Sequence, residues 1–369
     1  MRIATFSFLV SLLLASAANA NDIQIGIAGP MTGGMAAFGE QIRHGAQLAV
    51  DEINSQGGLL GRKITLLVED DACDPKQGRN VAAKLSNEKV AAVFGHWCTA
   101  VSMAASDVYA EEKILHIEIG ALLSELTQRG ITTLFRVSAT DKAFANALGG
   151  YAIEHNPGAA IAIVTDRPAV TMALTKYMKE FFDASPDKLV DVEEITTGDK
   201  DFSSVIDKLR NLKPGVVMCA CYTVEAGLLA RQLREKDLDV SFYSWDTINS
   251  PDFLSIVGKD NTGKIVSVDY AHPPQNALYL QFEKEIKKRG WPMETQTAIT
   301  YAAVEIFADA VRKAASLDSA KIAEVMHNNT FSTVLGDVKF AENGDRINPD
   351  FAAYQWVNGE LSLKETLPH

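Results

Sequence analysis

A short loop that contains Trp97 and Thr99 carries residue types suited to binding a carboxylate. The apolar run 90–94 before it predicts a buried strand, and residues 100–109 after it predict a helix. Loops at the carboxyl ends of parallel strands are where open α/β sheets bind ligands. The start of the next helix offers free N–H groups and the positive end of a dipole, and the Thr99 hydroxyl is suited to capping that helix or to bonding an anion. We therefore expect one half of a binding site here.

Other polar and aromatic residues follow further predicted strands. In the first half of the chain they are Phe38 and the turn Gly120-Ala121-Leu122, and in the second half they are Tyr222, Glu225 and Asp246. Two lobes whose loop edges face each other form a cleft, which is a favoured place for small ligands. A helix dipole on one wall and an acid with aromatic rings on the other would suit a zwitterion. Taken singly, Trp97 and Trp245 are more typical of packing, and Asp246 is also suited to capping the next helix.

Signatures of catalysis are missing from the sequence. The segment 258–264 has most of a phosphate-binding loop, but a predicted strand follows it, and Ile265 stands where the mechanism needs Ser or Thr. The glycines between 26 and 29 lack the dinucleotide-binding spacing, and no G-x-S-x-G or H-E-x-x-H occurs. We predict that the protein is not an enzyme and uses no cofactor.

Carboxylates and histidines that could bind a metal have simpler interpretations. Asp70, Asp71 and Asp74 follow a predicted strand, and carboxylates suit hard cations. A solvated polar loop at the strand end is the interpretation we favour. His96 and His116 are more typical of loop and core histidines than of ligands. We predict no metal site.

The first twenty residues are typical of a secretory signal peptide. Arg2 precedes the apolar run 6–15, and Ala18-Asn19-Ala20 matches an A-x-A cleavage pattern, so we expect cleavage after Ala20 and export. The run is short for a transmembrane anchor, and no second candidate span follows. A net charge of -12 disfavours nucleic acid and anionic membrane surfaces as partners. Hydrophobic residues at 47% and charged residues at 22% are ordinary for a globular protein.

The four cysteines fall into two pairs with different expectations. Cys73 and Cys98 lie in loops just past predicted strands that we expect to be neighbours, so we predict one disulfide between them in an oxidising compartment. Cys219 and Cys221 are two residues apart on the predicted strand 216–222 and point to the same face. Residues at that spacing on a strand do not bridge readily, so we expect buried free thiols, with a metal pair as a weaker alternative.

Strand-like and helix-like segments alternate almost throughout, in two successive sets. Among them we expect a helix at 75–87, which begins with a proline, and strands at 114–117, 134–137 and 265–268. Near the end of the chain we expect two short strands, 338–340 and 354–356, around the turn 342–345. Alternation of this kind predicts parallel sheets with helices on both faces, and two sets at this chain length predict two such lobes. The break between the sets falls near 138–141, and the chain then returns. We assign residues 21–139 with about 269–340 to lobe 1, and residues 140–268 with about 341–369 to lobe 2.

Five sequence words, in order along nearly all of the chain, carry a resemblance to a known family. They are Asp70-Asp71-Ala72-Cys73-Asp74-Pro75-Lys76-Gln77, Gly95-His96-Trp97-Cys98, Glu125-Leu126-Thr127-Gln128-Arg129-Gly130, Lys200-Asp201-Phe202-Ser203 and Ile299-Thr300-Tyr301-Ala302-Ala303. With them the chain resembles the periplasmic leucine/isoleucine/valine-binding proteins of branched-chain amino acid ABC transporters. The resemblance implies a type I periplasmic-binding fold of two lobes joined by three crossings, a disulfide between Cys73 and Cys98, and a periplasmic location.

The resemblance also implies roles for particular residues. Thr99 matches the hydroxyl that binds the ligand carboxylate, and Ala121 matches a backbone contact in the next loop. Asp246 matches the acid that pairs with the ligand ammonium. Tyr222 matches the aromatic residue of the second lobe, and Phe38 and Trp97 match apolar contacts around the ligand side chain.

Three departures from the family pattern bear on the ligand. Leu122 replaces a usual Thr, the segment 166–170 lacks a usual Tyr, and Asp246 stands where Glu is usual. A hydroxyl lost from a charged partner costs about 1.5–3 kcal/mol, enough to change specificity among small polar ligands. We expect a protein that captures an amino acid by hinge closure and delivers it to a membrane permease. The alternatives are an amide, urea-like or small organic acid ligand on the same fold, or a role as a sensor.

Overall fold

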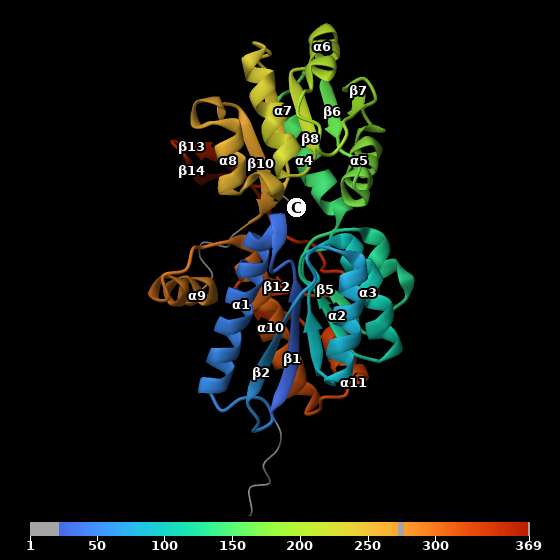
Figure 1. Ribbon diagram of the computed structural model, residues 1–369, viewed down its shortest axis with the longest axis vertical. Helices are drawn as coiled ribbons and strands as arrows, with labels where there is room; N and C mark the ends of the chain where they lie inside the picture. Colours follow the sequence, from blue (N-terminus) through green and yellow to red (C-terminus); the bar gives the residue numbers. More distant parts are fainter. Residues whose placement is uncertain (1–21, 272–276, 368–369) are drawn as a thin grey trace, which may run out of the picture.

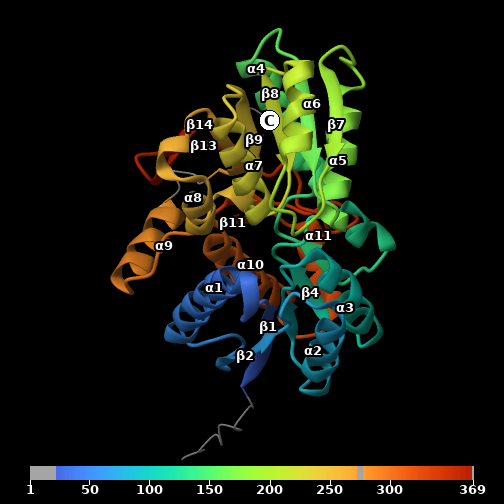
Figure 2. The ribbon, with the colours of Figure 1, turned by 45° about the horizontal axis from the view of Figure 1, so that its top comes forward.

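The computed structural model describes residues 22–271 and 277–367, which form two lobes built on two separate β-sheets (Figure 1). We call the five-stranded sheet with its helices the first lobe, and the seven-stranded sheet with its helices the second lobe. Figure 2 shows helices on both faces of each sheet. The predicted α/β fold with two parallel-sheet lobes is confirmed. The predicted signal peptide lies outside the described residues.

The first sheet is parallel throughout, in the order β2-β1-β3-β4-β5. Its strands are β1 (Ile23–Gly29), β2 (Ile64–Asp70), β3 (Ala92–Phe94), β4 (Leu115–Glu118) and β5 (Leu134–Arg136). One face is covered by α1 (Ala36–Ser55) and α10 (Thr295–Ala314), and the other by α2 (Pro75–Asn87) and α3 (Thr99–Glu111). The lobe also contains α9 (Ala277–Lys288), α11 (Ser319–Asn328) and the hairpin of β11 (Phe331–Thr333) and β12 (Gly336–Val338).

The second sheet has the order β14-β13-β10-β9-β8-β6-β7. Its strands are β6 (Ile161–Thr165), β7 (Leu189–Glu194), β8 (Val216–Ala220), β9 (Ser241–Ser244), β10 (Ile265–Tyr270), β13 (Phe351–Val357) and β14 (Glu360–Thr366). The helices α4 (Asp141–His155) and α5 (Ala169–Phe182) cover one face, and α6 (Ser203–Leu212), α7 (Thr223–Glu235) and α8 (Pro251–Val257) cover the other. Only β13 and β14 run antiparallel to their neighbours, so this sheet is mixed at one edge.

The chain passes between the two sheets three times. The first passage joins β5 to α4, the second joins β10 to α9, and the third joins β12 to β13. Each lobe is therefore assembled from segments that are far apart in the sequence, as the figures show by the mixture of colours in each half (Figures 1 and 2).

Of the two final strands predicted around the turn at 342–345, the one at 354–356 lies within β13 and is confirmed, whereas the one at 338–340 does not form as predicted. The strand β12 ends at Val338 and pairs with β11, whereas β13 lies in the other lobe. Phe340 forms only an isolated bridge with Arg346. The two predicted strands do not pair with each other because the chain leaves the first lobe between them.

Helix α1 shows why the helices pack where they do. Its residues Ile42, Ala46, Ala49 and Ile53 recur at the helical spacing and are buried, so they form one apolar stripe. Gly45 on the same side has no side chain, and a Cβ there would lie 2.3 Å from the Thr297 carbonyl oxygen. The glycine therefore lets α1 and α10 approach closely.

Both pairs of cysteines form disulfides. The predicted bond between Cys73 and Cys98 is confirmed, with 5.5 Å between the Cα atoms. The expectation of free thiols at Cys219 and Cys221 is wrong, because these residues are also bonded to each other, with 5.4 Å between the Cα atoms. The strand predicted to run to Tyr222 ends at Ala220. Cys221 therefore lies past the regular strand geometry on which that expectation depended.

Candidate functional site

The loop between β3 and α3 places Thr99 at the start of a helix, in a different position from the predicted cap. Cys98 is the N-cap residue of α3 and Thr99 is its first helical residue, so Thr99 does not cap the helix with its side chain. The first bonded N–H groups are those of Val101 and Ser102, which donate to the Cys98 carbonyl at 3.0 Å. Among the described residues, the N–H groups of Thr99 and Ala100 meet no acceptor, so an anion could accept hydrogen bonds from them.

A buried network beneath this loop fixes its position. The Cys73–Cys98 disulfide ties the loop to the one after β2. His96 Nδ1 lies 2.7 Å from Asp71 Oδ2, and His96 Nε2 lies 3.0 Å from the Tyr109 hydroxyl. A Cβ on Gly95, whose φ is +140°, would lie 2.1 Å from the Ala28 carbonyl oxygen, so only glycine fits there. The interpretation of His96 as a core histidine agrees with this geometry.

Phe38 and Trp97, predicted as apolar contacts, lie against each other. Their rings are stacked with centroids 4.1 Å apart. Trp97 also packs on Gly120, where a Cβ would lie 2.3 Å from Trp97 Cδ1. The start of α1 after β1 and the loops that follow β3 and β4 therefore meet at one edge of the first sheet, as the strand order requires.

The loop after β4, residues 119–123, has most of its backbone groups satisfied internally. Glu118 is fully buried, and its Oε1 accepts hydrogen bonds from the N–H groups of Ile119, Gly120 and Ala121 at 2.9, 2.9 and 2.8 Å. Burial alone would raise the pKa of Glu118, but the nearby His116 ring, with Nε2 3.6 Å from Glu118 Oε2, and the hydrogen bond from the Ala121 N–H hold that pKa below its ordinary value. Glu118 is therefore a charged carboxylate that organises this loop.

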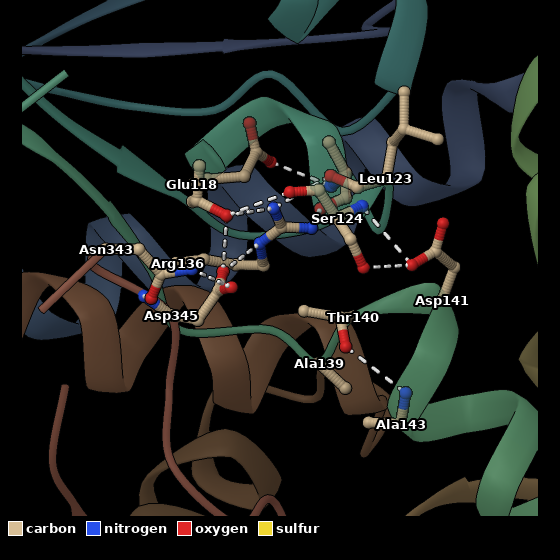
Figure 3. A network of polar contacts seen from close by, with 12 residues as sticks. Glu118, Leu123, Ser124, Arg136, Ala139, Thr140, Asp141, Ala143, Asn343 and Asp345 are labelled. Carbon is tan, nitrogen blue, oxygen red and sulfur yellow. Dashed lines mark hydrogen bonds and ion pairs between the residues drawn. The ribbon is translucent and has the colours of Figure 1, made fainter. Parts of the chain in front are cut away.

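Arg136 holds the same loop from the other side. It is fully buried, and its guanidinium donates to the carbonyl oxygens of Ala121 and Leu123, each at 2.9 Å. The N–H and the carbonyl of Ala121 thus both have partners within the protein. Figure 3 shows Arg136 directed toward Asp345, whose Oδ1 lies 3.0 Å from Arg136 Nε.

The second lobe places Tyr222 and Asp246 on neighbouring strands. Tyr222 follows β8 and Asp246 follows β9, and the Tyr222 ring centroid lies 6.1 Å from that of Trp245. Burial, together with the charges of Asp166 and Asp246, raises the pKa of Tyr222. Asp246 does not cap α8, because Ser250 does so by accepting from the Phe253 N–H at 3.3 Å.

A second acid, Asp269, lies beside Asp246 at the end of β10. Asp269 is buried and accepts hydrogen bonds from the Tyr270 N–H at 2.6 Å, from Asn249 at 2.8 Å and from Thr295 at 3.2 Å. Burial raises the pKa of Asp269 to about 6. Burial and then the charge of Asp269 raise the pKa of Asp246 well above its ordinary value. Within the described ranges no cation pairs with either acid, so a bound cation would favour their charged forms.

Hydrogen bonds hold the segment 245–247 in place. The Cys221 carbonyl oxygen accepts from the Trp245 indole N–H at 2.8 Å and from the Thr247 hydroxyl at 2.9 Å. The Glu225 carboxylate accepts from the Gly198 N–H at 2.8 Å, so it serves a loop of its own lobe. Asp246 therefore lies between Trp245 and Thr247, both held by hydrogen bonds, whereas Glu225 is already bonded to Gly198.

The structure thus groups the six predicted ligand-binding residues into two sets, one on each lobe. Phe38, Trp97, Thr99 and Ala121 belong to the first lobe, and Tyr222 and Asp246 belong to the second. No hydrogen bond, ion pair or ring contact between described residues joins one set to the other. The lobes are linked elsewhere, by Thr295 to Asp269 and by the Ala139 N–H, which donates to the Tyr270 hydroxyl.

Other possible sites lie away from these residues. A cavity of about 320 Å³ lies against α5, and one of about 190 Å³ lies between α1 and α10, and neither is lined by any of the six residues. Within residues 22–271 and 277–367, no three His, Cys, Asp or Glu side chains are arranged to hold a metal ion. Asp70 instead accepts from the Met31 N–H at 2.9 Å and from the Thr32 hydroxyl at 2.5 Å. Over the same ranges no helix has the length and apolar character needed to span a bilayer.

Sequence reasoning missed Asp269, Glu118 and Arg136. The predicted strands stopped at 268 and 117, one residue short of each acid, although an acid directly after a buried strand is the same signal that selected Asp246. Arg136 lies within a predicted strand at 134–137, where a buried arginine has no local signal.

Comparisons with known proteins match segments of both lobes over more than nine-tenths of the chain. The family model described as "Periplasmic binding protein" matches residues 22–360. The Leu/Ile/Val-binding protein homolog 1 of Brucella abortus (strain 2308) is 35% identical over 339 residues, which cover 92% of this chain and 91% of that protein. A leucine-, isoleucine-, valine-, threonine- and alanine-binding protein of Pseudomonas aeruginosa is 32% identical over 339 residues, covering 91% and 90%. Among solved structures, the chain is similar to the branched-chain amino acid transporter substrate binding protein LivJ from Streptococcus pneumoniae, whose crystal structure is in complex with isoleucine. The TM-score is 0.84 at 23% identity, and the match covers 94% of this chain and 99% of that one.

Proposed function

This chain belongs to the periplasmic binding protein family, and we propose that it captures an amino acid between its lobes and delivers it to the membrane permease of an ABC transporter. The resemblance found in the sequence words is confirmed by relatives that cover more than nine-tenths of the chain. Proteins of this family bind solutes and are not enzymes. We extend this to the present chain and propose that it catalyses no reaction.

The observation that carries the proposal is the opposite polarity of the two lobe edges. The first lobe offers the free N–H groups of Thr99 and Ala100 at the start of α3, which suit a carboxylate. The second lobe offers Asp246 and Asp269 without a cationic partner in the described chain, which suits an ammonium group. An α-amino acid carries both groups. Tyr222, Phe38 and Trp97 lie at the same edges, where they would contact the ligand side chain.

The cellular setting follows from family and sequence together. We propose that residues 1–20 are a signal peptide cleaved after Ala20 and that the mature protein acts in the periplasm. Ligand contacts to both lobes would stabilise a closed form, since a ligand shifts a conformational equilibrium by its differential affinity for the two states. The closed form would present both lobes to the permease.

A second candidate ligand class is an amide, urea-like molecule or small organic acid. The observation that favours it is the loss of two hydroxyl groups that the family usually has near the ligand. Leu122, which is buried and apolar, stands where Thr is usual, and the segment 166–170 contains no Tyr. Such a ligand would lack an ammonium group, so it would leave Asp246 without its expected partner.

A thermal-shift screen separates these ligand classes. The purified protein would be melted with each amino acid and with a panel of amides and small acids. A ligand that binds the folded form raises the melting temperature according to its excess over Kd, by about 2.7 kcal/mol of stability at a hundredfold excess. We expect at least one amino acid to shift the melting temperature. A shift by amides or acids alone would overturn the proposal in favour of the second candidate.

Asp246→Asn tests the ammonium half of the site. Removing one partner of a buried charge pair costs 2–5 kcal/mol, so we expect affinity for the amino acid to fall about thirtyfold or more in calorimetric titrations. Asp239→Asn is the matched control, because Asp239 is an exposed acid of the same lobe that pairs with Lys264 at 2.6 Å. Unchanged affinity in Asp246→Asn would remove this residue from the site.

A further inference from the structure

The loop at residues 119–123, which contains Ala121, is held by contacts from two directions. One set comes from the first lobe and the third passage of the chain, through Arg136 and Asp345. The other comes from Asp141, the first residue of α4 in the second lobe. Figure 3 shows both sets around the same short stretch of chain.

The first set is an arginine-centred network. Arg136 donates to the carbonyl oxygens of Ala121 and Leu123 and to the Thr127 hydroxyl at 3.0 Å. Asp345 lies beside the Arg136 guanidinium and also accepts from the Thr127 hydroxyl at 2.9 Å. These bonds join the loop to the segment that leads into the third passage.

The second set comes from the second lobe. The Asp141 N–H donates to the Leu122 carbonyl oxygen at 2.9 Å. Its carboxylate Oδ1 accepts from the Ser124 N–H at 3.2 Å and also from the Ser124 hydroxyl. Asp141 is fully buried, and burial raises its pKa, so the Ser124 hydroxyl offsets part of the cost of keeping it there.

An ordinary helix-start role does not account for Asp141. The cap of α4 is Thr140, whose hydroxyl oxygen accepts from the Ala143 N–H at 3.2 Å. The Asp141 carboxylate accepts from the N–H of its neighbour Lys142 at 2.8 Å, but its other hydrogen bonds come from Ser124 in the first lobe. Its carboxylate therefore joins the two lobes next to the first passage.

We propose that Asp141 and Ser124 are positioning residues that couple rotation of the second lobe to the shape of the 119–123 loop. Helix α4 turns with the second lobe, and its first residue is bonded to Leu122 and Ser124, whereas Arg136 anchors Ala121 and Leu123 to the first lobe. Lobe rotation therefore pulls on Leu122 and Ser124 while their neighbours stay tied to the first lobe, so it changes the shape of the loop and the position of Gly120, on which Trp97 packs. This inference rests on the proposed function for its link to binding, but the coupling itself requires no ligand.

Hydrogen–deuterium exchange of the ligand-free protein tests the coupling directly. In Ser124→Ala the hydroxyl bond to Asp141 is lost, and we expect amides 119–124 to exchange about tenfold faster than in the wild type. Ser124→Thr keeps a hydroxyl and should restore slow exchange. Thr140→Ala is the matched control, because it weakens α4 at the neighbouring residue without touching the loop, so the loop should exchange at the wild-type rate.

Two exchange results would overturn the proposal. One is an exchange rate in Ser124→Ala within twofold of wild type, and the other is an equal acceleration in Thr140→Ala. Either would mean that the Ser124–Asp141 bonds serve only local stability.

Titration with L-leucine, L-isoleucine and L-valine then tests whether the coupling reaches the ligand. For the amino acid that binds the wild type, we expect Kd to rise about tenfold in Ser124→Ala and to stay unchanged in Thr140→Ala, although Thr140→Ala lowers the melting temperature at least as much. A Kd that follows the melting temperature in both variants would count against the inference. If no amino acid in the thermal screen binds the wild type, the proposed function fails, and the exchange experiment alone decides the coupling.

Discussion

Asp246 and Asp269 are two acids at the ends of neighbouring strands β9 and β10, and burial and then the charge of Asp269 raise the pKa of Asp246. Among the described residues, the groups that donate to Asp269 are neutral: the Tyr270 N–H, the Asn249 amide and the Thr295 hydroxyl. Burying a carboxylate without a cation stabilises its protonated form. In the ligand-free protein the protonated forms of these two acids are therefore favoured, and a bound ammonium group would favour their ionised forms.

The stability of the ligand-free protein should fall as pH rises past Asp269. Its folded-state pKa is about 6, above the value near 3.9 of an unfolded chain, so the folded protein binds the proton more tightly. The contribution of Asp269 to the free energy of unfolding is therefore complete below about pH 4. It is lost as pH rises through about 6, a decrease of roughly 3 kcal/mol. Urea denaturation of wild type and Asp269→Asn between pH 4 and 7 measures it.

The Asn variant should lack this part of the pH dependence and should be the more stable protein at pH 7. Asp239→Asn, at an exposed acid, should keep the wild-type profile. A wild-type profile in Asp269→Asn would contradict the assignment.

Candidate site residues at strand ends could be selected from the sequence alone. Trp97, Tyr222 and Asp246 were selected in this way, and the structure places each just after the carboxyl end of a strand, whereas their contact with a ligand stays a prediction. The sequence did not show which backbone N–H and carbonyl groups have hydrogen-bond partners inside the protein. That the N–H and carbonyl of Ala121 have internal partners depends on Glu118 and Arg136, which approach the loop only through tertiary folding.

At the scale of elements, the disulfide between Cys73 and Cys98 joins the loop after β2 to the start of α3. The Asp71–His96 pair lies beside it and is fully buried. The free N–H groups of Thr99 and Ala100 follow directly. A rigid helix start offers these groups to an anion without the entropy cost of ordering a loop on binding.

Replacing Cys73 and Cys98 with serine should destabilise the protein by about 3 kcal/mol, because the bond closes a segment with a sequence separation of 25. Urea denaturation of the oxidised wild type and the double variant measures the loss. The denatured, unreduced wild type should show no free thiols, since Cys219 and Cys221 are also bonded. Two reactive thiols per wild-type chain would show that one of the two disulfides is absent, and four would show that both are absent.

Elements with strong apolar periodicity were predicted closely, and elements defined by distant partners were not. Helix α2 was predicted with the bounds that the structure has, Pro75–Asn87, because a proline marks its start. The hairpin partner β11 and the edge strand β14 were missed. β14 is largely exposed along its length, so its sequence lacks the apolar alternation by which strands are recognised.

At the scale of the molecule, the three passages allow the lobes to rotate while few contacts cross between them. Those contacts include Asp269 with Thr295, Ala139 with Tyr270, and Asp141 with Ser124. Bonds of this kind near the passages restrict the direction of rotation without fixing its extent. Closure around a ligand is therefore the motion that this architecture favours.

Closure should be visible as a smaller radius of gyration in small-angle X-ray scattering. A compact chain of this length has a radius of gyration of about 20 Å, and the ligand found in the thermal screen should bring the protein toward that value. Asp246→Asn at the same ligand concentration should keep the larger radius. An unchanged radius in the wild type at saturating ligand would contradict capture by closure.

The return of the chain to the second lobe also sets an order of events during synthesis. The first sheet needs α10 to cover one face, and β10 gains its outer neighbour only when β13 has been made. Because ribosomes release a chain from its N-terminus, neither lobe can complete its core until the segments after Glu294 and Asp350 emerge. Nascent chains of this protein therefore remain incompletely folded until nearly all of the sequence has been translated.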